Sequence, residues 1–399
     1  MEDVMTRTTQ HSQSKPPRSQ RRRTIELACA TFVCLAATIF GATSAAATPS
    51  GATSKPSLQQ DADALVAGGA PGAILLVRDG GKTTRVTSGV ADLETKSPIV
   101  AADHYRIASL TKTYVATVVL QLIAEHRLKL SDTVERWLPG VLRNGNTITI
   151  QMLLNHTSGL YDHERDPEVL QPYLNGNLGY DWAPIRLVKL ADSRPAHYAP
   201  GHTRVSTYSS TNYSVLGLVV RAVTGRPIGA ELKRRLFEPL RLTQTSYPLN
   251  KTQLPEPYAH GYFPLQPPTL TDLSAFSPSL SGAAGAIVST VDDVATFYRA
   301  LLTGRLLAPT QLKAMKTTLP DPQGDLPQRM GLGLIRFTTA CGYAWGHSGS
   351  FPGYWTHAWT SADGKRQAVL MLNEDPDGTS PATRTAFYHA LNDAYCSST

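Results

Sequence analysis

Near each end of the chain, two short strand-like runs are separated by a polar turn that contains glycine. The first turn is residues 79–82 and the second is residues 362–365. Runs of this length on both sides of such a turn are typical of β-hairpins. The four runs are residues 72–78, 84–90, 354–360 and 367–373. We therefore expect both ends of the chain to be rich in strands.

Between these ends the apolar positions follow helical spacing. Residues 110–126 show it most clearly, and a last helix is expected to close the chain. The other helical segments are residues 212–224, 290–303 and 381–395. The pattern predicts an α/β (α+β) fold, in which an antiparallel sheet is flanked by helices and carries an inserted, mainly helical subdomain. We expect the sheet part to span residues 61–108 and 285–399, the helical part residues 109–284, and the site to lie at their junction.

The first 47 residues differ from the rest of the chain. Three arginines at residues 21–23 precede an apolar run over residues 27–40, and Ala45-Ala46-Ala47 follows as a small-residue cleavage site. The alternative, a membrane anchor, needs about 20 uninterrupted apolar residues. We predict a cleaved signal peptide at 1–47, a flexible linker at 48–60 and one folded domain at 61–399. The mature protein would be secreted and extracellular, without a stable membrane span.

The net charge and the absence of certain motifs exclude some classes of binding partner. Loss of residues 1–47 removes six basic and three acidic residues, so the formal net charge falls from +7 to +4. This mild excess, without a basic run, argues against nucleic acid as a partner. The chain has no H-E-x-x-H and no C-x-x-C spacing, so we expect no metal and no cofactor. We expect a monomer.

Two cysteines, Cys341 and Cys396, remain after cleavage. In an oxidising compartment they are expected to form a disulfide, and two buried free thiols are the alternative.

Ser109 and Lys112 form the first candidate for chemistry, in the motif Ser109-Leu110-Thr111-Lys112. Residues three apart on a helix share one face, so the amine can reach the hydroxyl. The start of the helix also offers backbone N–H groups to an oxyanion. This combination supplies a nucleophile and its base. The structural alternative is a serine that only caps a helix.

Two later segments are further candidates. Tyr208 precedes the helical residues 212–224, and a phenol near a lysine can have a lowered pKa and transfer protons, although such a tyrosine can also be a core residue. The second segment is Trp345-Gly346-His347-Ser348-Gly349-Ser350, whose glycines would let an extended ligand lie alongside the strand. Its backbone N–H at Ser350 would complete an oxyanion hole with that of Ser109. The alternative is a β-bulge with a surface histidine.

The order of these motifs resembles that of the serine β-lactamase and penicillin-binding family: S-x-x-K, then Y-x-N or S-x-N, then K-T-G or H-x-G. The resemblance covers residues 60–396 and is greatest to secreted D-alanyl-D-alanine carboxypeptidases related to class C β-lactamases. It extends to residues 154–160, 199–201, 211–213, 283–286, 331–334 and 353–354. Two cysteines of those relatives match Cys341 and Cys396.

The resemblance implies a role for each site residue. Ser109 would be the nucleophile, Lys112 its proton acceptor, and Tyr208 the group that protonates the leaving group. His347 stands where many relatives have lysine, and would tune the electrostatics of Tyr208 and of the substrate carboxylate. The residues expected to bind substrate are Ser210, Arg336, Ser348, Gly349 and Ser350.

At two positions the sequence differs from those relatives in a way that affects substrate recognition. Ser210 stands where relatives have asparagine, and a hydroxyl has one donor instead of two. Arg336 is one residue beyond the place where close relatives have an arginine, and on a strand a shift of one residue turns a side chain to the other face.

The expected activity is that of a serine D-Ala-D-Ala carboxypeptidase that acts on cell-wall peptides and binds β-lactams. The alternatives of the same fold are a class C-like β-lactamase, an esterase and a D-amino-acid amidase, which differ in the acyl group that enters and in how fast water removes it. A non-catalytic penicillin-binding domain has no need of all four candidate catalytic groups. An α/β-hydrolase is excluded because no G-x-S-x-G occurs.

Overall fold

The computed structural model describes residues 57–202, 204–266, 269–375 and 378–396, which belong to one compact unit. The predicted signal peptide and residues 48–56 of the predicted linker lie outside the described residues. The remainder of that linker is not extended, because helix α1 begins at Leu58. Ser57 and Gln60 form a capping box at its start, which explains why the helix begins three residues before the expected position.

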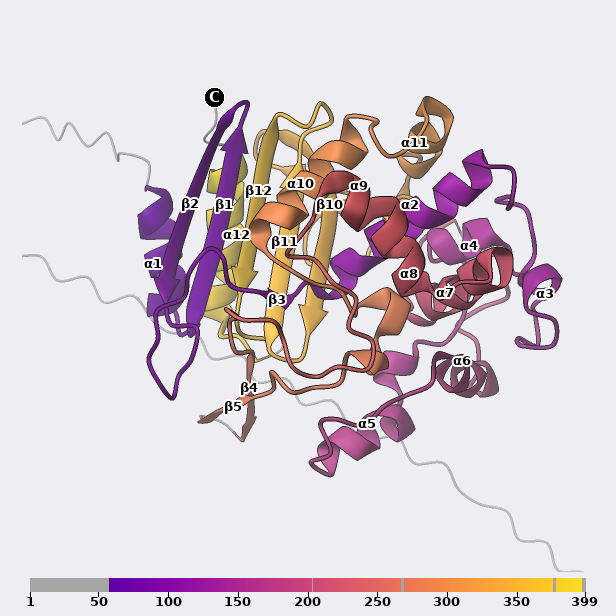
Figure 1. Cartoon of the computed structure of the whole chain (residues 1–399), viewed down its shortest axis with the longest axis horizontal. Helices are drawn as coiled ribbons and strands as arrows, with labels where there is room; N and C mark the ends of the chain where they lie inside the picture. The colour runs from indigo at the N-terminus through magenta and orange to yellow at the C-terminus, as the bar shows by residue number, and fades with distance from the viewer. Residues whose placement is uncertain (1–56, 203, 267–268, 376–377, 397–399) are drawn as a thin grey trace, which may run out of the picture. The chain divides into compact units, whose positions relative to one another are not determined.

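The two ends of the chain meet in one antiparallel sheet of eight strands, in the order β2-β1-β12-β11-β10-β9-β8-β7. The N-terminal hairpin joins the C-terminal strands because β1 pairs with β12, for example Leu76 with Val369. Figure 1 shows indigo and yellow strands side by side in this sheet. Both predicted hairpins and the shared sheet are confirmed. The strands are β1 (Gly72–Asp79), β2 (Lys82–Gly89), β7 (Leu319–Asp321), β8 (Gln328–Met330), β9 (Ile335–Thr339), β10 (Gly342–Phe351), β11 (Tyr354–Thr360) and β12 (Arg366–Leu372).

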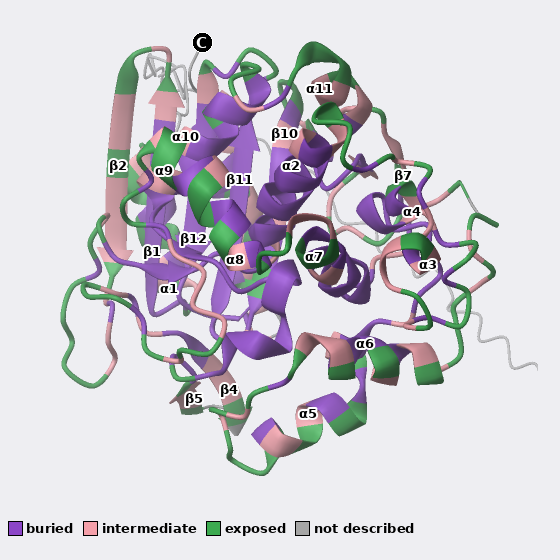
Figure 2. Ribbon diagram, turned by 45° about the vertical axis from the view of Figure 1, so that its right-hand side comes forward, coloured by how far each residue is buried: buried purple, intermediate pink, exposed green. Residues whose placement is uncertain are grey.

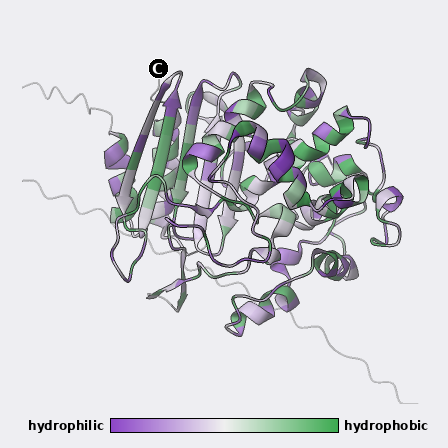
Figure 3. Cartoon of the chain, viewed as in Figure 1, coloured by the Kyte–Doolittle hydropathy of each residue, from purple (hydrophilic) through white to green (hydrophobic). Residues whose placement is uncertain are grey.

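Helices cover both faces of the sheet. On β1, Ile74 and Leu76 pack on the side of the helical part, whereas Leu75 packs against the helix that closes the chain, because successive strand residues point to opposite faces. The central strands are therefore buried on both sides, while the edge strand β2 is polar and partly exposed (Figures 2 and 3). Helices α1 (Leu58–Ala67) and α12 (Pro381–Cys396) cover one face, and α10 (Val291–Leu302) covers the other.

The helical part supplies the other side of the site. Its centre is formed by α2 (Thr111–Ala124) and α7 (Thr211–Thr224), which are in contact and begin close to their predicted positions. The remaining helices are α3 (Val134–Trp137), α4 (Ile150–Leu154), α5 (Pro167–Leu174), α6 (Pro184–Ser193), α8 (Ile228–Leu232), α9 (Glu238–Leu240) and α11 (Pro309–Met315), with short turns η1 (Ala108–Leu110), η2 (His163–Arg165), η3 (Lys233–Phe237), η4 (Pro278–Leu280) and η5 (Gly282–Ala284).

Two small strand pairs lie outside the main sheet. β3 (Tyr105–Arg106) pairs with β6 (Val288–Ser289), and β4 (Tyr262–Gln266) pairs with β5 (Thr269–Asp272). The second pair falls within residues 109–284, so the part expected to be mainly helical also contains a hairpin. Among the described residues, no helix is long and apolar enough to cross a bilayer.

Cys341 and Cys396 form a disulfide that joins the start of β10 to the end of α12. The loop that it closes spans 55 residues. In the unfolded chain this cross-link restricts the conformations available to the loop.

We expect the double substitution Cys341→Ala/Cys396→Ala to lower the free energy of unfolding by up to about 4 kcal/mol, the loop-entropy value for this length. Urea denaturation of the variant and of the wild type, each with and without reductant, measures the loss. Reductant should destabilise only the wild type. Equal stability of all four samples would contradict the prediction.

Candidate active site

Ser109 lies in the tight turn η1, at the entry to the buried helix α2. The residue before it, Ala108, has a φ of 52°, a left-handed conformation that side chains other than glycine rarely adopt. Strained backbone of this kind is concentrated at functional sites, where the surrounding structure holds it in place. The first N–H groups of a helix have no partner within the helix, so the N–H of Ser109 is available to an oxyanion.

Lys112 lies one turn further on, and its side chain is fully buried. Its Nζ is 2.9 Å from Ser109 Oγ, 3.2 Å from Ser210 Oγ and 3.0 Å from the carbonyl oxygen of Ala284. A charged ammonium donates all three hydrogen bonds. A neutral amine donates to Ser210 and Ala284 and turns its lone pair toward the hydroxyl of Ser109, as a base requires.

The pKa of Lys112 is lowered to about 8, because burial disfavours the charged form. The carboxylates of Glu164 and Asp162 oppose this effect. A lysine with this pKa is neutral in an appreciable fraction of molecules at neutral pH, so it can accept the proton of Ser109.

Tyr208 lies over the same amine, with its ring centre 4.8 Å from Lys112 Nζ. Its pKa is raised well above the usual value by burial, although a hydrogen bond with Ser109 lowers it in part. The expectation of a lowered pKa is therefore wrong, because loss of hydration outweighs the nearby lysine. Tyr208 is a neutral phenol that touches the nucleophile and can donate a proton.

His156 holds the ring of Tyr208 in place and was not singled out as a site residue from the sequence. The two rings are stacked, with centres 4.4 Å apart and planes 20° from parallel. His156 Nδ1 accepts from the backbone N–H of Ser209 and lies 3.1 Å from Asn212 Nδ2, so the proton of the neutral ring is on Nε2. Burial lowers the pKa of His156 well below its usual value. The residue lies within 154–160, which marked the resemblance but carried no assigned role.

His347 lies on β10, where many relatives have lysine, and it is also neutral. Burial lowers its pKa to about 3, and the charge of Lys112 adds to this effect. Its Nδ1 is 2.5 Å from the carbonyl oxygen of Ser348, so Nδ1–H donates there and Nε2 is left as an acceptor. The ring centre is 6.4 Å from that of Tyr208. A neutral imidazole supplies no positive charge for a substrate carboxylate.

The strand β10 passes directly against the turn that carries Ser109. A Cβ at Gly349 would lie 2.5 Å from the carbonyl oxygen of Ile107, so only glycine fits this crossing. The crossing brings the backbone of Ser350 next to the turn, as the predicted oxyanion hole requires. Ser348 is half-buried and Ser350 exposed. β9 pairs with β10 only as far as Gly346, so the described strands leave the next stretch of that edge open to an extended ligand.

Arg336 is not brought to this site. Its position on β9 pairs with Trp345, two residues before His347, and its guanidinium stacks 4.5 Å from the ring centre of Tyr343. With Tyr343 it lines a hollow of about 650 Å³ that is shared with Asp363 of the β11–β12 turn. The expectation that Arg336 binds a substrate carboxylate does not fit this structure, because its side chain extends away from His347 and packs on Tyr343 near the start of β10.

Glu164 is a site residue that the sequence did not reveal. The hydroxyl of Ser210 donates to Glu164 Oε2 over 2.8 Å while its oxygen accepts from Lys112. The single proton of Ser210 is therefore engaged, which does not fit the expected role of a donor to substrate. Lys112 lowers the pKa of Glu164, although burial opposes it, so the group is a carboxylate. Burial and the charge of Glu164 raise the pKa of the neighbouring Asp162.

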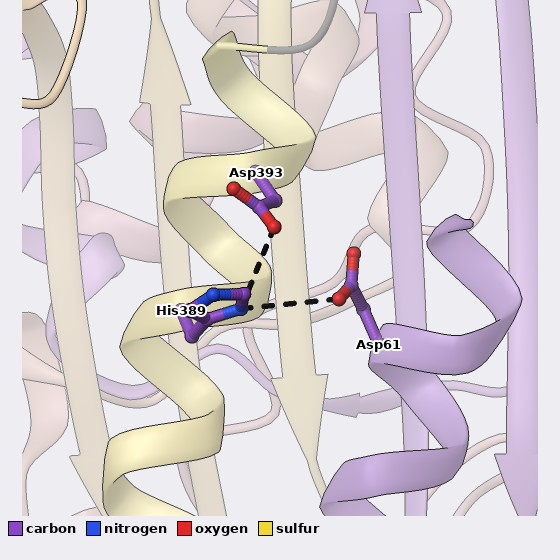
Figure 4. A group of neighbouring side chains, drawn as sticks. All are labelled: Asp61, His389 and Asp393. Atoms are coloured by element: carbon purple, nitrogen blue, oxygen red, sulfur yellow. Dashed lines mark ion pairs between the residues drawn. The ribbon is translucent and has the colours of Figure 1, made fainter. Parts of the chain in front are cut away.

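A second cluster of ionisable groups lies between α1 and α12, on the other face of the sheet (Figure 4). His389 Nδ1 is 3.4 Å from Asp393 Oδ2 and 4.0 Å from Asp61 Oδ1. One histidine and two carboxylates can bind a metal ion, and these ligand atoms lie within 4.8 Å of one another. The contacts are also those of ordinary ion pairs, and we assign the cluster to the packing of the two helices.

Comparison with known proteins identifies the family. The model of the family described as Beta-lactamase matches residues 58–392. The chain belongs to this family. Among curated proteins, it is 29% identical over 325 residues to the putative penicillin-binding protein PbpX of Bacillus subtilis (strain 168), which covers 81% of this chain and 76% of that protein.

Solved structures of the same fold extend the comparison. A D-stereospecific amidohydrolase from Streptomyces sp. is 36% identical, with a TM-score of 0.77 over 85% of this chain and 98% of that chain. The D-amino acid amidase from Ochrobactrum anthropi SV3, complexed with D-phenylalanine, is 27% identical, with a TM-score of 0.76 over 86% of this chain and 98% of that chain. The chain is thus a hydrolase of the serine β-lactamase fold.

The buried amine predicts a pH dependence. Only neutral Lys112 can accept a proton, so kcat/KM for p-nitrophenyl acetate, which does not itself titrate, should rise through a pKa of about 8. Glu164→Gln removes a charge that favours the ammonium, so the rise should move to lower pH.

The exposed, Arg194-paired carboxylate of Glu168 provides the control, because Glu168→Gln should leave the profile unmoved. A rise that stays in place or moves to higher pH in Glu164→Gln would rule out this account of Lys112.

Proposed function

We propose that this chain is a D-stereospecific hydrolase of amides and esters of D-amino acids that carry a free α-amino group. The proposal depends on one observation: the ionised carboxylate of Glu164 is linked to Lys112 through the hydroxyl of Ser210, whereas His347 in the same site is neutral. Similarity to the D-stereospecific amidohydrolase and the D-amino acid amidase supports the substrate class.

In the proposed reaction, Lys112 takes the proton of Ser109 as its oxygen attacks the acyl carbon. The N–H groups of Ser109 and Ser350 stabilise the oxyanion that forms. Tyr208, neutral and hydrogen-bonded to Ser109, donates a proton to the leaving amine or alcohol and regains one from Lys112. Water then attacks the acyl-enzyme with the same groups in reversed roles, and the D-amino acid leaves.

The charge distribution favours an ammonium group in the substrate. Opposite charges a few ångströms apart in a poorly hydrated site attract strongly, and a carboxylate in the same place would be repelled. Glu164 accepts hydrogen bonds from the hydroxyls of Ser210 and Ser281. Its two carboxylate oxygens have about four acceptor positions, so the group can still bind a substrate N–H. A free α-amino group next to the scissile carbonyl fits this arrangement.

The second candidate is the D-Ala-D-Ala carboxypeptidase activity expected from the sequence, which similarity to a putative penicillin-binding protein favours. That reaction would be favoured by a positive group that binds the substrate's terminal carboxylate. His347 is neutral and Arg336 lies at Tyr343, so this part of the site rests on the hydroxyls of Ser348 and Ser350.

The proposal is tested with D-phenylalanine amide, its L-enantiomer and N-acetyl-D-phenylalanine amide. The wild type should prefer the D-amide, and Ser109→Ala should be inactive. Glu164→Gln should lower kcat/KM for the free amine by 10- to 150-fold, which corresponds to one charge-assisted hydrogen bond. It should affect the acetylated substrate only through the lower pKa of Lys112.

Glu168→Gln again serves as the matched control and should behave as the wild type. Equal losses on the free and the acetylated amides would remove Glu164 from substrate recognition, and preference for the L-amide would overturn the proposed specificity.

The carboxypeptidase alternative makes a different prediction. If the terminal carboxylate is bound, kcat/KM should be much higher for a D-Ala-D-Ala peptide acid than for the same peptide amide. We expect instead that the two are cleaved at similar rates. Arg336→Ala should have no effect on either, because its guanidinium stacks on Tyr343. A tenfold or greater preference for the acid would favour the carboxypeptidase, and its loss in Arg336→Ala would place that residue at the substrate.

A further inference from the structure

A basic hollow lies between the β1–β2 hairpin and the end of α10, away from the residues of the candidate active site. Its volume is about 590 Å³, which exceeds the size of a single phosphate ion. Three arginines line it, Arg78 from β1, Arg299 from the last turn of α10, and Arg305 just beyond. The other lining residues are Gly81, Thr83, Thr296, Ala300 and Thr303, so no carboxylate of the described residues contributes to its wall.

Little negative charge surrounds the three guanidinium groups, although Asp292 acts on Arg78 from beyond ion-pair distance. Among the described residues, none of them forms an ion pair, whereas the neighbouring Arg85 is neutralised by a two-point contact with Asp292. Burial lowers the pKa of Arg78, and the charge of Arg299 lowers it further, whereas Asp292 opposes both effects. The two cations therefore repel one another across the hollow.

The position of Arg78 differs from that of the other two arginines. Arg299 and Arg305 favourably complement the C-terminal end of α10, but Arg78 lies on an inner strand of the sheet. It is half-buried, and its bonds are to the neutral oxygens of Thr83, at 3.1 Å, and Gln367, at 3.0 Å. Burying part of a cation beside neutral partners costs stability, and a bound anion would offset that cost.

The neighbours of Arg78 fix its direction. Arg78 pairs with Gln367 across the β1–β12 ladder, and directly opposed residues share one face of a sheet. Gln367 Nε2 donates to the carbonyl oxygen of Ala295 in α10 over 2.8 Å, so this face points toward α10. Arg78 therefore faces the helix that carries Arg299.

We propose that this hollow binds a compound with at least two phosphate groups, such as a pyrophosphate or a phosphodiester chain. Guanidinium groups bind phosphate oxygens in pairs of parallel hydrogen bonds, and threonine hydroxyls can add further donors. Three arginines around one hollow match an anion with more than one charge. The site is independent of the proposed function, since none of its residues belongs to the active site.

Isothermal titration calorimetry at low ionic strength tests the proposal with two probes, sodium pyrophosphate and poly(glycerol phosphate). We expect one site per chain, and at least tenfold weaker binding in Arg78→Gln/Arg299→Gln. The control pair Arg221→Gln/Arg226→Gln removes the same charge from exposed arginines at the end of α7 and should bind as the wild type. Tighter binding of the polymer would identify a phosphodiester chain as the ligand, and tighter binding of pyrophosphate a small molecule.

A second variant tests the site without changing Arg78, whose replacement could disturb folding of the sheet. Arg299→Gln/Arg305→Gln changes only exposed side chains, leaves Arg78 in its strand and should also weaken binding at least tenfold. All variants should keep the p-nitrophenyl acetate activity of the wild type, which confirms their fold. Absence of binding to both probes by the wild type, or equal weakening in the control pair, would overturn the proposal.

Discussion

The burial of Lys112 is the constraint around which the site is organised. An amine taken out of water loses hydration, so its charged form is disfavoured and the group becomes a base. The same burial requires hydrogen-bond partners for the nitrogen, and Ser109, Ser210 and Ala284 provide them from three different segments. Helix α2 can bury a lysine this deeply only because the neighbouring segments place hydrogen-bonding groups around its amine.

Close packing around that lysine explains several sequence features. Gly333 has a φ of 71°, and a Cβ there would come within 2.5 Å of Ala116 Cβ and of the hydroxyl of Tyr213. Its place in residues 331–334 therefore reflects the approach of this loop to α2 and α7. Similarly, Ala284 contributes a backbone oxygen rather than a side chain. Residues 283–286 and 331–334, which carry no reactive side chain, thus form part of the packing around the site.

The sequence was sufficient for the fold and for the expectation that Ser109, Lys112 and Tyr208 lie together, because strong periodic patterns and ordered motifs specify both. It also predicted the disulfide that the structure contains. It could not give the charge of buried groups, since the pKa values of Tyr208 and His347 depend on how much water the folded chain removes. Glu164 escaped notice because its hydrogen bond crosses from η2 to Ser210 at the start of α7. Asp162, Glu164 and Asp166 follow residues 154–160 directly, and this run of acids was the available signal.

The pairing of β1 with β12 has a consequence for how the protein is made. β1 begins at Gly72, but the strand beside it begins only at Arg366. A ribosome therefore releases almost the whole chain before the central sheet can close, and contacts between such distant segments form slowly. Until then the apolar faces of β1 lack their cover, and such exposed apolar surface makes an incomplete chain prone to aggregate. The topology thus sets a long interval during which the chain is synthesised but its central sheet is incomplete.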